Sequence, residues 1–365
     1  LLMEMVARLT LVTQQPLGKI VGKTLGKTVV YLLFISVLLG CTAYQAGNLL
    51  GGFAGLKLFV ALEPKLVLIM AGVAGFILWL GSMNRISKVL AGVVLMMGVA
   101  FLYTGLSTAF APVISQTDRV ISTGTVLALI GTTIVPYNFF LAAGLSQRQS
   151  LGEMQNGLLV SFVIGGLITL GILLTGTALG SFTSFADLAG VLTNKIGEMG
   201  GILLGLGLVA AGFSSAITAP LAAAIAGRTL LANEDAAISW SSTGNWFRLV
   251  WLTVLGIGAV VASLDLDIIP VILEAQVVNG LLVPLLAALI IYLGNQRNLL
   301  GDQVNRHWQN IGGLLVFGYI TYQSIFKLGS LASIELTQSF VVLITTSAVV
   351  SLEYLIIQGR RNELQ

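Results

Sequence analysis

The sequence predicts an all-α membrane protein, and three observations support this fold class. Of 365 residues, 56% are hydrophobic and only 9% are charged, whereas roughly a quarter of the residues of a soluble domain carry charge. Apolar runs of 18 or more residues recur along the chain, and such a run crosses a hydrocarbon core of roughly 30 Å. The polar connections between them are too short to fold alone. We therefore expect a single transmembrane domain over residues 1–365.

The apolar runs give the expected helices in chain order. The opening LLMEMVARLTLVT resembles the second half of a membrane helix that starts upstream, so we expect the chain to be incomplete at its N-terminus. Segments 14–28 and 182–200 mix polar and apolar residues near helical period, which predicts helices along the membrane surface. About ten complete spans are expected: 29–55, 64–82, 88–110, 125–146, 157–181, 201–231, 246–263, 268–293, 309–326 and 337–358.

The distribution of charge and the single cysteine and histidine exclude several classes of function. Most of the 18 basic residues fall in loops on one side of the predicted membrane, which places segment 14–28 and the C-terminus in the cytoplasm and requires no nucleic-acid partner. The single cysteine, Cys41, excludes an internal disulfide, and the single histidine, His307, lies in a loop. Because the chain shows no nucleophile–base set, we do not expect an enzyme.

The stretch GTTIVPYNFF at 131–140 lies inside a predicted span. Pro136 removes a backbone hydrogen bond, and Gly131 loosens the helix just before it. The alternative is a simple proline kink. Asn138 favours a discontinuous helix, because unwound carbonyls beside an amide oxygen are typical cation ligands in transporters.

Two further spans carry polar residues. ILEAQVVNGLLVP at 272–284 contains Glu274, Gln276 and Asn279, with the last two on one helix face. Helix–helix hydrogen bonding is the alternative role. GCTAYQAGNLLGG at 40–52 spaces Thr42, Gln45 and Asn48 by three residues, which makes an uncharged polar stripe.

These motifs resemble those of the Nramp divalent-metal transporters, which have a LeuT-like fold with inverted five-helix repeats. The family's sixth helix carries a motif close to G-A-T-x-M-P-H-N, which is similar to GTTIVPYN at 131–138. Its eighth helix, A-A-G-Q-S-S-T-x-T-G, resembles AAGFSSAITA at 210–219, and its tenth, S-Q-V-V-L-S-L-Q-L-P, resembles AQVVNGLLVP at 275–284. The family's Asp-Pro-Gly-Asn motif of the first helix does not occur, which agrees with a chain that begins within the second helix.

Several residues differ from the family pattern, and these differences affect which ion we expect the protein to transport. A methionine that favours Mn²⁺ and Fe²⁺ aligns with Val135, and a histidine aligns with Tyr137. Acidic residues that carry protons align with Gln45 and Asn48, and an arginine aligns with Thr253. The loss of the soft thioether weakens discrimination against Mg²⁺. Amide and hydroxyl groups do not exchange protons near neutral pH. The chain therefore resembles the Nramp-related magnesium branch most.

The resulting hypothesis is transport of Mg²⁺ and/or Mn²⁺ by alternating access, without proton coupling. It implies metal ligands at Thr132, Asn138 and Gln276, with Val135, Tyr137, Gln45, Asn48, Thr253, Glu274 and Asn279 in a second shell or pathway. Glu274 adds negative potential or forms a structural ion pair. No cofactor is expected, since the divalent cation is the substrate.

The expected location is a bacterial plasma membrane. The expected partners are the metal ion and the lipid bilayer, with no obligate protein partner. The alternatives are a proton-coupled Mn²⁺/Fe²⁺ symporter and a sodium-coupled amino-acid carrier of the same fold.

Overall fold

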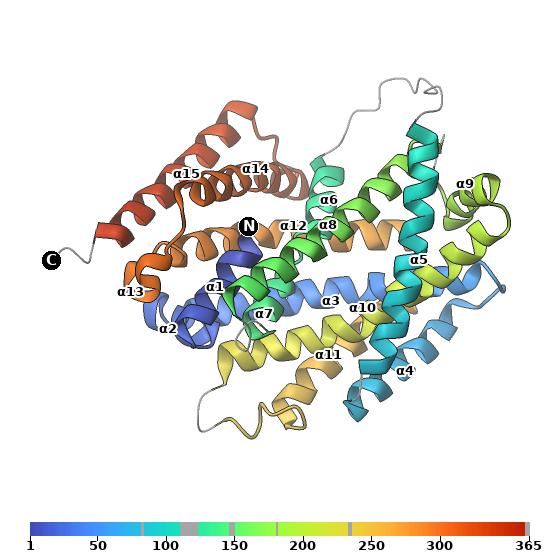
Figure 1. The fold of residues 1–365 in the computed structure, drawn as a ribbon, viewed down its shortest axis with the longest axis horizontal. Coiled ribbons are helices and arrows are strands. Elements are labelled where there is room, and N and C mark those ends of the chain that lie inside the picture. The colour runs from blue at the N-terminus through green and yellow to red at the C-terminus, as the bar shows by residue number, and fades with distance from the viewer. Residues whose placement is uncertain (82–83, 110–122, 146–149, 180–181, 233–235, 362–365) are drawn as a thin grey trace.

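The regular elements of the structure are helices. The computed structural model describes residues 1–81, 84–109, 123–145, 150–179, 182–232 and 236–361, and the regular secondary structure within these ranges is α-helix or 3₁₀-helix, with no strand. Long helices cross one another at the centre of the molecule, and the last two, α14 and α15, lie side by side at one edge (Figure 1). The predicted all-α fold class is confirmed.

The spans follow the predicted order with small shifts at their ends. Nine helical segments of the described chain are long and apolar enough to cross a membrane, with α6 and α7 counted together, and the predicted span at 64–82 is a shorter apolar helix over Pro64–Leu80. Residues 82, 110, 146 and 181, the predicted ends of four spans, lie outside the described residues. The long helices are α3 (Lys27–Lys57), α5 (Asn84–Ala109), α8 (Leu151–Gly176), α10 (Met199–Leu231), α11 (Asn245–Ala262), α12 (Ile268–Leu293), α14 (His307–Leu331) and α15 (Gln338–Arg361).

The remaining helices are short. The two predicted surface segments each contain one, α2 (Leu17–Leu25) and α9 (Phe185–Ile196). Pro16 precedes α2, and Ser184 and Asp187 form a capping box that begins α9. The others are α1 (Leu2–Thr13), η1 (Pro64–Leu66), α4 (Val67–Leu80), α6 (Thr123–Thr133), α7 (Pro136–Leu145), α13 (Arg297–Leu300) and η3 (Gly301–Gln303).

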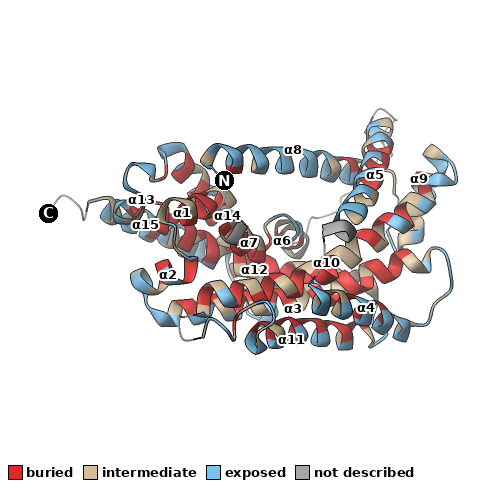
Figure 2. Ribbon diagram, turned by 60° about the horizontal axis from the view of Figure 1, so that its bottom comes forward, coloured by how far each residue is buried: buried red, intermediate tan, exposed pale blue. Residues whose placement is uncertain are grey.

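Helices α3 and α10 form the centre of the packed core. They run alongside each other, and the buried residues concentrate along them (Figure 2). Their backbones touch where Gly52 meets Gly212, and a Cβ on Gly212 would lie 2.5 Å from the Gly52 Cα atom. Small residues allow this approach, and in lipid close packing must replace the hydrophobic drive between helices. The pair is a rigid support against which α11 and α12 also pack.

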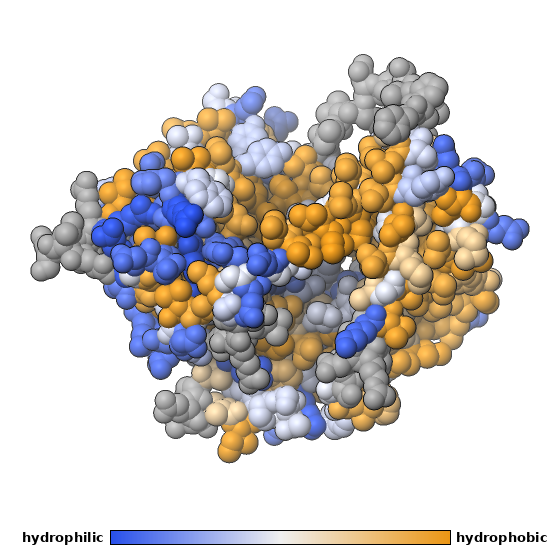
Figure 3. Space-filling view, viewed as in Figure 1, coloured by the Kyte–Doolittle hydropathy of each residue, from blue (hydrophilic) through white to orange (hydrophobic). Residues whose placement is uncertain are grey.

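The outer helices present apolar side chains outward. Helix α8 packs on α5, yet only 6% of its most apolar window is buried within the protein. Exposed leucines, isoleucines and valines line the rest of its surface. Apolar side chains gather in the middle of the molecule, whereas hydrophilic ones gather around α1, α2 and α13 (Figure 3). This distribution suits a protein that spans a membrane with a polar end on one side.

A buried polar network joins α1 to the end of the chain. Arg8 is 5% exposed, donates to the Gln309 Oε1 atom at 3.4 Å, and also donates to the side chain of Asn305. Asn295 and Asn310 exchange two hydrogen bonds of 2.8 Å. Further bonds tie this cluster to Glu4 and Arg360. The network therefore fixes α1 against the loops on both sides of α13.

Candidate metal site

The predicted discontinuous helix at 125–146 is present. Helix α6 ends at Thr133, Ile134 and Val135 are not helical, and α7 begins at Pro136. Proline is well suited to a first helical position, because the amide it lacks has no intrahelical partner there. The helical bond to the Thr132 carbonyl would come from residue 136, which has no N–H, so this oxygen is free of its usual partner. The break therefore presents a backbone oxygen within the span.

Helix α12 crosses α6 at the break. A Cβ on Gly131 would overlap the carbonyl oxygen of Gln276 and would lie 2.9 Å from the Gly280 backbone nitrogen. On the other side, a Cβ on Gly280 would lie 2.6 Å from the Leu127 carbonyl oxygen. Only glycine at both positions permits this approach. The two glycines thus bring Gln276 next to the unwound segment, although they lie far apart in sequence.

Two amide oxygens of α12 are buried without hydrogen-bond partners. They are the Gln276 Oε1 atom and the Asn279 Oδ1 atom. The Asn279 amide nitrogen donates to the Ala275 carbonyl at 3.3 Å, and its oxygen points at Gly40 of α3, 2.6 Å from where a Cβ would lie. An unpaired buried acceptor costs about 1–3 kcal/mol. Such oxygens are candidate ligands for a cation.

Two tyrosines close this region from the side of α3 and α7, and the sequence interpretation missed one of them. Tyr44 lies next to the Gln276 side chain. The rings of Tyr44 and Tyr137 are perpendicular, with centroids 6.3 Å apart. Tyr137 and Val135 are buried, and Asn138 is half-buried in the first turn of α7. Tyr44 stands in the polar cluster at 40–52, but its helical spacing alone does not show which helix it faces.

Gln45 and Asn48 lie on a different face of α3. The Gln45 amide nitrogen donates to the Ala216 carbonyl of α10 at 2.9 Å, and Gly258 of α11 packs against the Gln45 side chain. Asn48 is 8% exposed, and its backbone oxygen meets Gly212 of α10. Buried polar atoms of both side chains, Gln45 Oε1 and Asn48 Nδ2, lack partners. These two residues therefore face α10 and α11, whereas Tyr44 faces α12.

Glu274 and Thr253 are not gathered with the other predicted residues. The Glu274 side chain is 67% exposed, and its Oε1 atom lies 3.9 Å from the Lys327 Nζ atom of α14. Of the two roles expected for Glu274, the structure shows an ion pair. Thr253 is exposed on α11 and lines a surface groove with Tyr31 and Phe34. The structure thus places Gln276 against Gly131 of α6 and against Tyr44, and Tyr44 against Tyr137, with Thr132 exposed near the end of α6, and it leaves Glu274 and Thr253 outside.

The donor set consists of oxygens. Among the described residues, no group of three or more histidines, cysteines, aspartates or glutamates is placed to hold a metal ion. The groups near the break are a backbone carbonyl, amide oxygens and phenol oxygens, which are neutral ligands. Neutral oxygens suit hard divalent cations that retain part of their water shell. The arrangement can bind such a cation weakly, which is what a transport site requires.

Comparisons with known proteins agree with this architecture. A protein-family model described as "Natural resistance-associated macrophage protein-like" matches residues 1–329. A divalent metal cation transporter, MntH, of Klebsiella pneumoniae is 25% identical over 91% of this chain and 86% of its own length. An uncharacterized membrane protein of Bacillus subtilis, YcsG, is 21% identical over 82% of this chain and 76% of its own length. A manganese transporter of Eremococcus coleocola superposes with a TM-score of 0.69 at 18% identity, covering 98% of this chain and 84% of that one.

Proposed function

The chain belongs to the Nramp family of membrane transporters, whose fold is LeuT-like, and from this premise we propose that it moves divalent metal cations across a membrane by alternating access. One observation supports this proposal above all: the broken helix at Ile134 and Val135 lies beside Gln276, whose amide oxygen is buried without a partner. Transporter helices that break at the bilayer midplane offer such oxygens to cations. The protein is a transporter and not an enzyme, and the metal is its substrate and not a cofactor.

The proposed ligands are the Thr132 carbonyl, Asn138 and Gln276. The first lacks its helical hydrogen bond because of Pro136, and the second begins α7 through a bond of 3.0 Å from its backbone nitrogen to the Val135 carbonyl. Asn279 supports the site from the following turn of α12. Tyr44 and Tyr137 limit access from the side.

The proposed substrates are Mg²⁺ and Mn²⁺. Val135 supplies no sulfur, so the site has no soft ligand with which to prefer Mn²⁺ strongly. Gln45, Asn48 and Thr253 carry no titratable group, and Glu274 is exposed and paired with Lys327. These residues provide no proton path, so we propose uncoupled transport. The proposed orientation in a bacterial plasma membrane puts α2 and the C-terminus on the cytoplasmic side.

The test uses the protein in liposomes with an internal pH indicator. We expect entry of both Mg²⁺ and Mn²⁺ without acidification. Mn²⁺ entry with acidification and no Mg²⁺ entry would instead show a proton-coupled symporter. Sodium-driven amino-acid uptake without entry of either metal ion would show a sodium-coupled amino-acid carrier.

The ligand assignment is tested by Gln276→Ala. Removing the Gln276 amide should leave the folded protein intact, because its buried Oε1 atom has no hydrogen-bond partner and the lost interaction with the Tyr44 side chain costs roughly 1 kcal/mol. Cation entry should fall at least tenfold, as expected for roughly 1.4 kcal/mol of lost ligand energy. Gln358→Ala on the exposed face of α15 is the matched control and should transport normally. Normal transport by Gln276→Ala would remove this residue from the site.

A further inference from the structure

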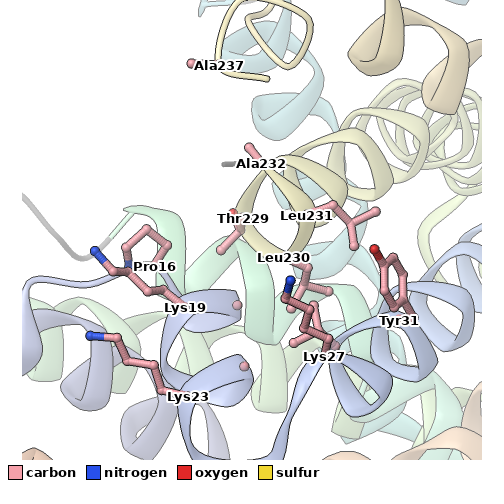
Figure 4. Close-up of a pocket in the computed structure, with 13 residues that line it drawn as sticks. Pro16, Lys19, Lys23, Lys27, Tyr31, Thr229, Leu230, Leu231, Ala232 and Ala237 are labelled. Carbon is pink, nitrogen blue, oxygen red and sulfur yellow. The ribbon is translucent and has the colours of Figure 1, made fainter. Parts of the chain in front are cut away.

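A basic cavity lies at the end of the molecule that carries α2. Its volume is about 880 Å³, which is within the range of small-molecule sites. It opens between α2, the start of α3 and the end of α10, and Lys19, Lys23 and Lys27 line it (Figure 4). The two described ion pairs of the protein involve none of these lysines. Three lysines therefore line one cavity without a carboxylate partner among the described residues, and in Figure 4 Lys19 and Lys23 extend to one side while Lys27 extends toward Leu230.

The cavity is held in shape by tight packing between helices. Gly18 of α2 lies so close to α10 that a Cβ would be 2.5 Å from the Thr229 carbonyl oxygen and 2.6 Å from that of Leu230. Leu17, Ile20 and Val21 bury the inner face of α2. Lys19 and Lys23 lie on the exposed face of α2, as in helices that rest in the membrane surface, and Lys27 begins α3. The basic cavity is thus formed by fixed elements.

The floor of the cavity is apolar. Val30 and Leu230 are buried there, while Tyr31 and Leu231 also line it. In Figure 4 the Lys27 side chain extends from the start of α3 toward the end of α10, close to Leu230, with Tyr31 beside Leu231. A small inorganic anion would contact only the three lysines. An amphiphile would contact both the lysines and the apolar floor.

A second, apolar groove continues from this cavity. It has a volume of about 380 Å³, and it shares Tyr31 and Leu231 with the basic cavity. Its other lining residues are Phe34, Leu38, Trp240, Trp246, Leu249, Val250 and Thr253. Tryptophans concentrate at the level of lipid headgroups. The groove therefore begins near the membrane surface and runs inward between α3 and α11.

The basic cavity and the groove together match one lipid leaflet in length. From Lys27 in the cavity to Leu38 in the groove, α3 advances by 11 residues, or about 16 Å at 1.5 Å per residue. Half of a hydrocarbon core is roughly 15 Å. From these observations we propose that the basic cavity and the apolar groove form one binding site for an anionic phospholipid, with the phosphate at the three lysines and an acyl chain along the groove. This site is separate from the proposed metal ligands, and Thr253 contributes to its wall.

The test compares lipids on the detergent-solubilised protein by native mass spectrometry. The probes are phosphatidylglycerol and phosphatidylcholine with the same acyl chains. The wild type should retain phosphatidylglycerol in preference, and added salt should reduce this preference. Lys19→Gln/Lys23→Gln/Lys27→Gln should weaken phosphatidylglycerol binding about a hundredfold, from roughly fivefold for each lysine near a charged lipid. Lys57→Gln/Lys65→Gln/Lys195→Gln removes the same charge elsewhere and should bind as the wild type does.

The outcomes distinguish the sources of the anion. Inorganic phosphate and glycerophosphate at matched concentration should not displace the lipid, because they leave the groove empty. Displacement by either would show a small-anion site and overturn the proposal. Equal retention of both lipids by the wild type would also overturn it. An equal loss of phosphatidylglycerol binding in the two triple variants would do the same. The wild-type comparison decides the question even where the lysine variant fails to fold.

Discussion

Replacing Gly131 by alanine is the most direct test of how the site is assembled. The new methyl group would overlap the Gln276 carbonyl oxygen and would lie 2.9 Å from the Gly280 nitrogen. Ordinary contacts to carbon are about 3.5 Å. Both neighbours are backbone atoms, so no side chain can rotate away. Helices α6 and α12 must therefore separate by roughly 1 Å or more.

The expected change in the free energy of unfolding has two parts. Overpacking of this kind costs roughly 1–3 kcal/mol of the free energy of unfolding, and the better helix propensity of alanine returns at most about 1 kcal/mol. We expect a net destabilisation of about 1–2 kcal/mol. Transport should suffer more, because displacement of a binding group by about 1 Å can cost up to a hundredfold.

The assay measures Mn²⁺ entry into liposomes together with the midpoint of thermal unfolding. Gly72→Ala in α4 is the matched control, since a Cβ there meets no atom within 4 Å; it should keep normal transport and equal or higher stability. Normal transport and unchanged unfolding of Gly131→Ala would refute the reasoning that the α6–α12 approach positions Gln276.

The remaining predictions concern selectivity, stability and pH. Val135→Met adds a soft sulfur at the break and should raise Mn²⁺ entry relative to Mg²⁺ severalfold in the same liposomes; an unchanged ratio would place Val135 away from the ion. Arg8→Leu removes the donor to the Asn305 Oδ1 atom and the ion-pair partner of Glu4, whereas Gln309 keeps its bond from the Arg306 amide. It should lower the free energy of unfolding by about 3 kcal/mol; a loss below about 1 kcal/mol would mean that the network relaxes. The Thr183 amide and hydroxyl hold the pKa of Asp187 below its usual 3.8, so its contribution to α9 is present above that pH and is lost as the pH falls below it. The protection of the α9 amides against hydrogen exchange, taken relative to the intrinsic exchange rate at each pH, should therefore fall at low pH in the wild type, while Asp187→Asn should show less of this dependence.

Local chemistry made the discontinuous helix predictable from sequence. Pro136 lacks an N–H and cannot continue α6 whatever surrounds it, and Gly131 and Asn138 mark the same point. The membrane spans were equally predictable from the sequence, because each follows from the length of an apolar run. The end of the span at 64–82 was harder to predict, because the helix stops where Gly81 adopts φ 68° after Leu80.

The sequence could not show which residues of different helices face one another. Tyr44 and Gln45 are consecutive residues that point about 100° apart around α3, but only packing shows that Tyr44 faces Gln276 and that Gln45 faces Ala216. Likewise, Thr253 entered the predicted pathway by resemblance, whereas the structure places it in a surface groove with Tyr31.

The sequence by itself determined the membrane class, the order of the helices and the position of the break. These depend on the solvent preference of each segment and on backbone chemistry at single residues. Which oxygens are left unpaired, and which lysines share a cavity, was decided only by the tertiary structure. The physical reason is that both depend on contacts such as Gly131 with Gln276 and Gly18 with Leu230, which join residues distant in the chain and leave no local signature.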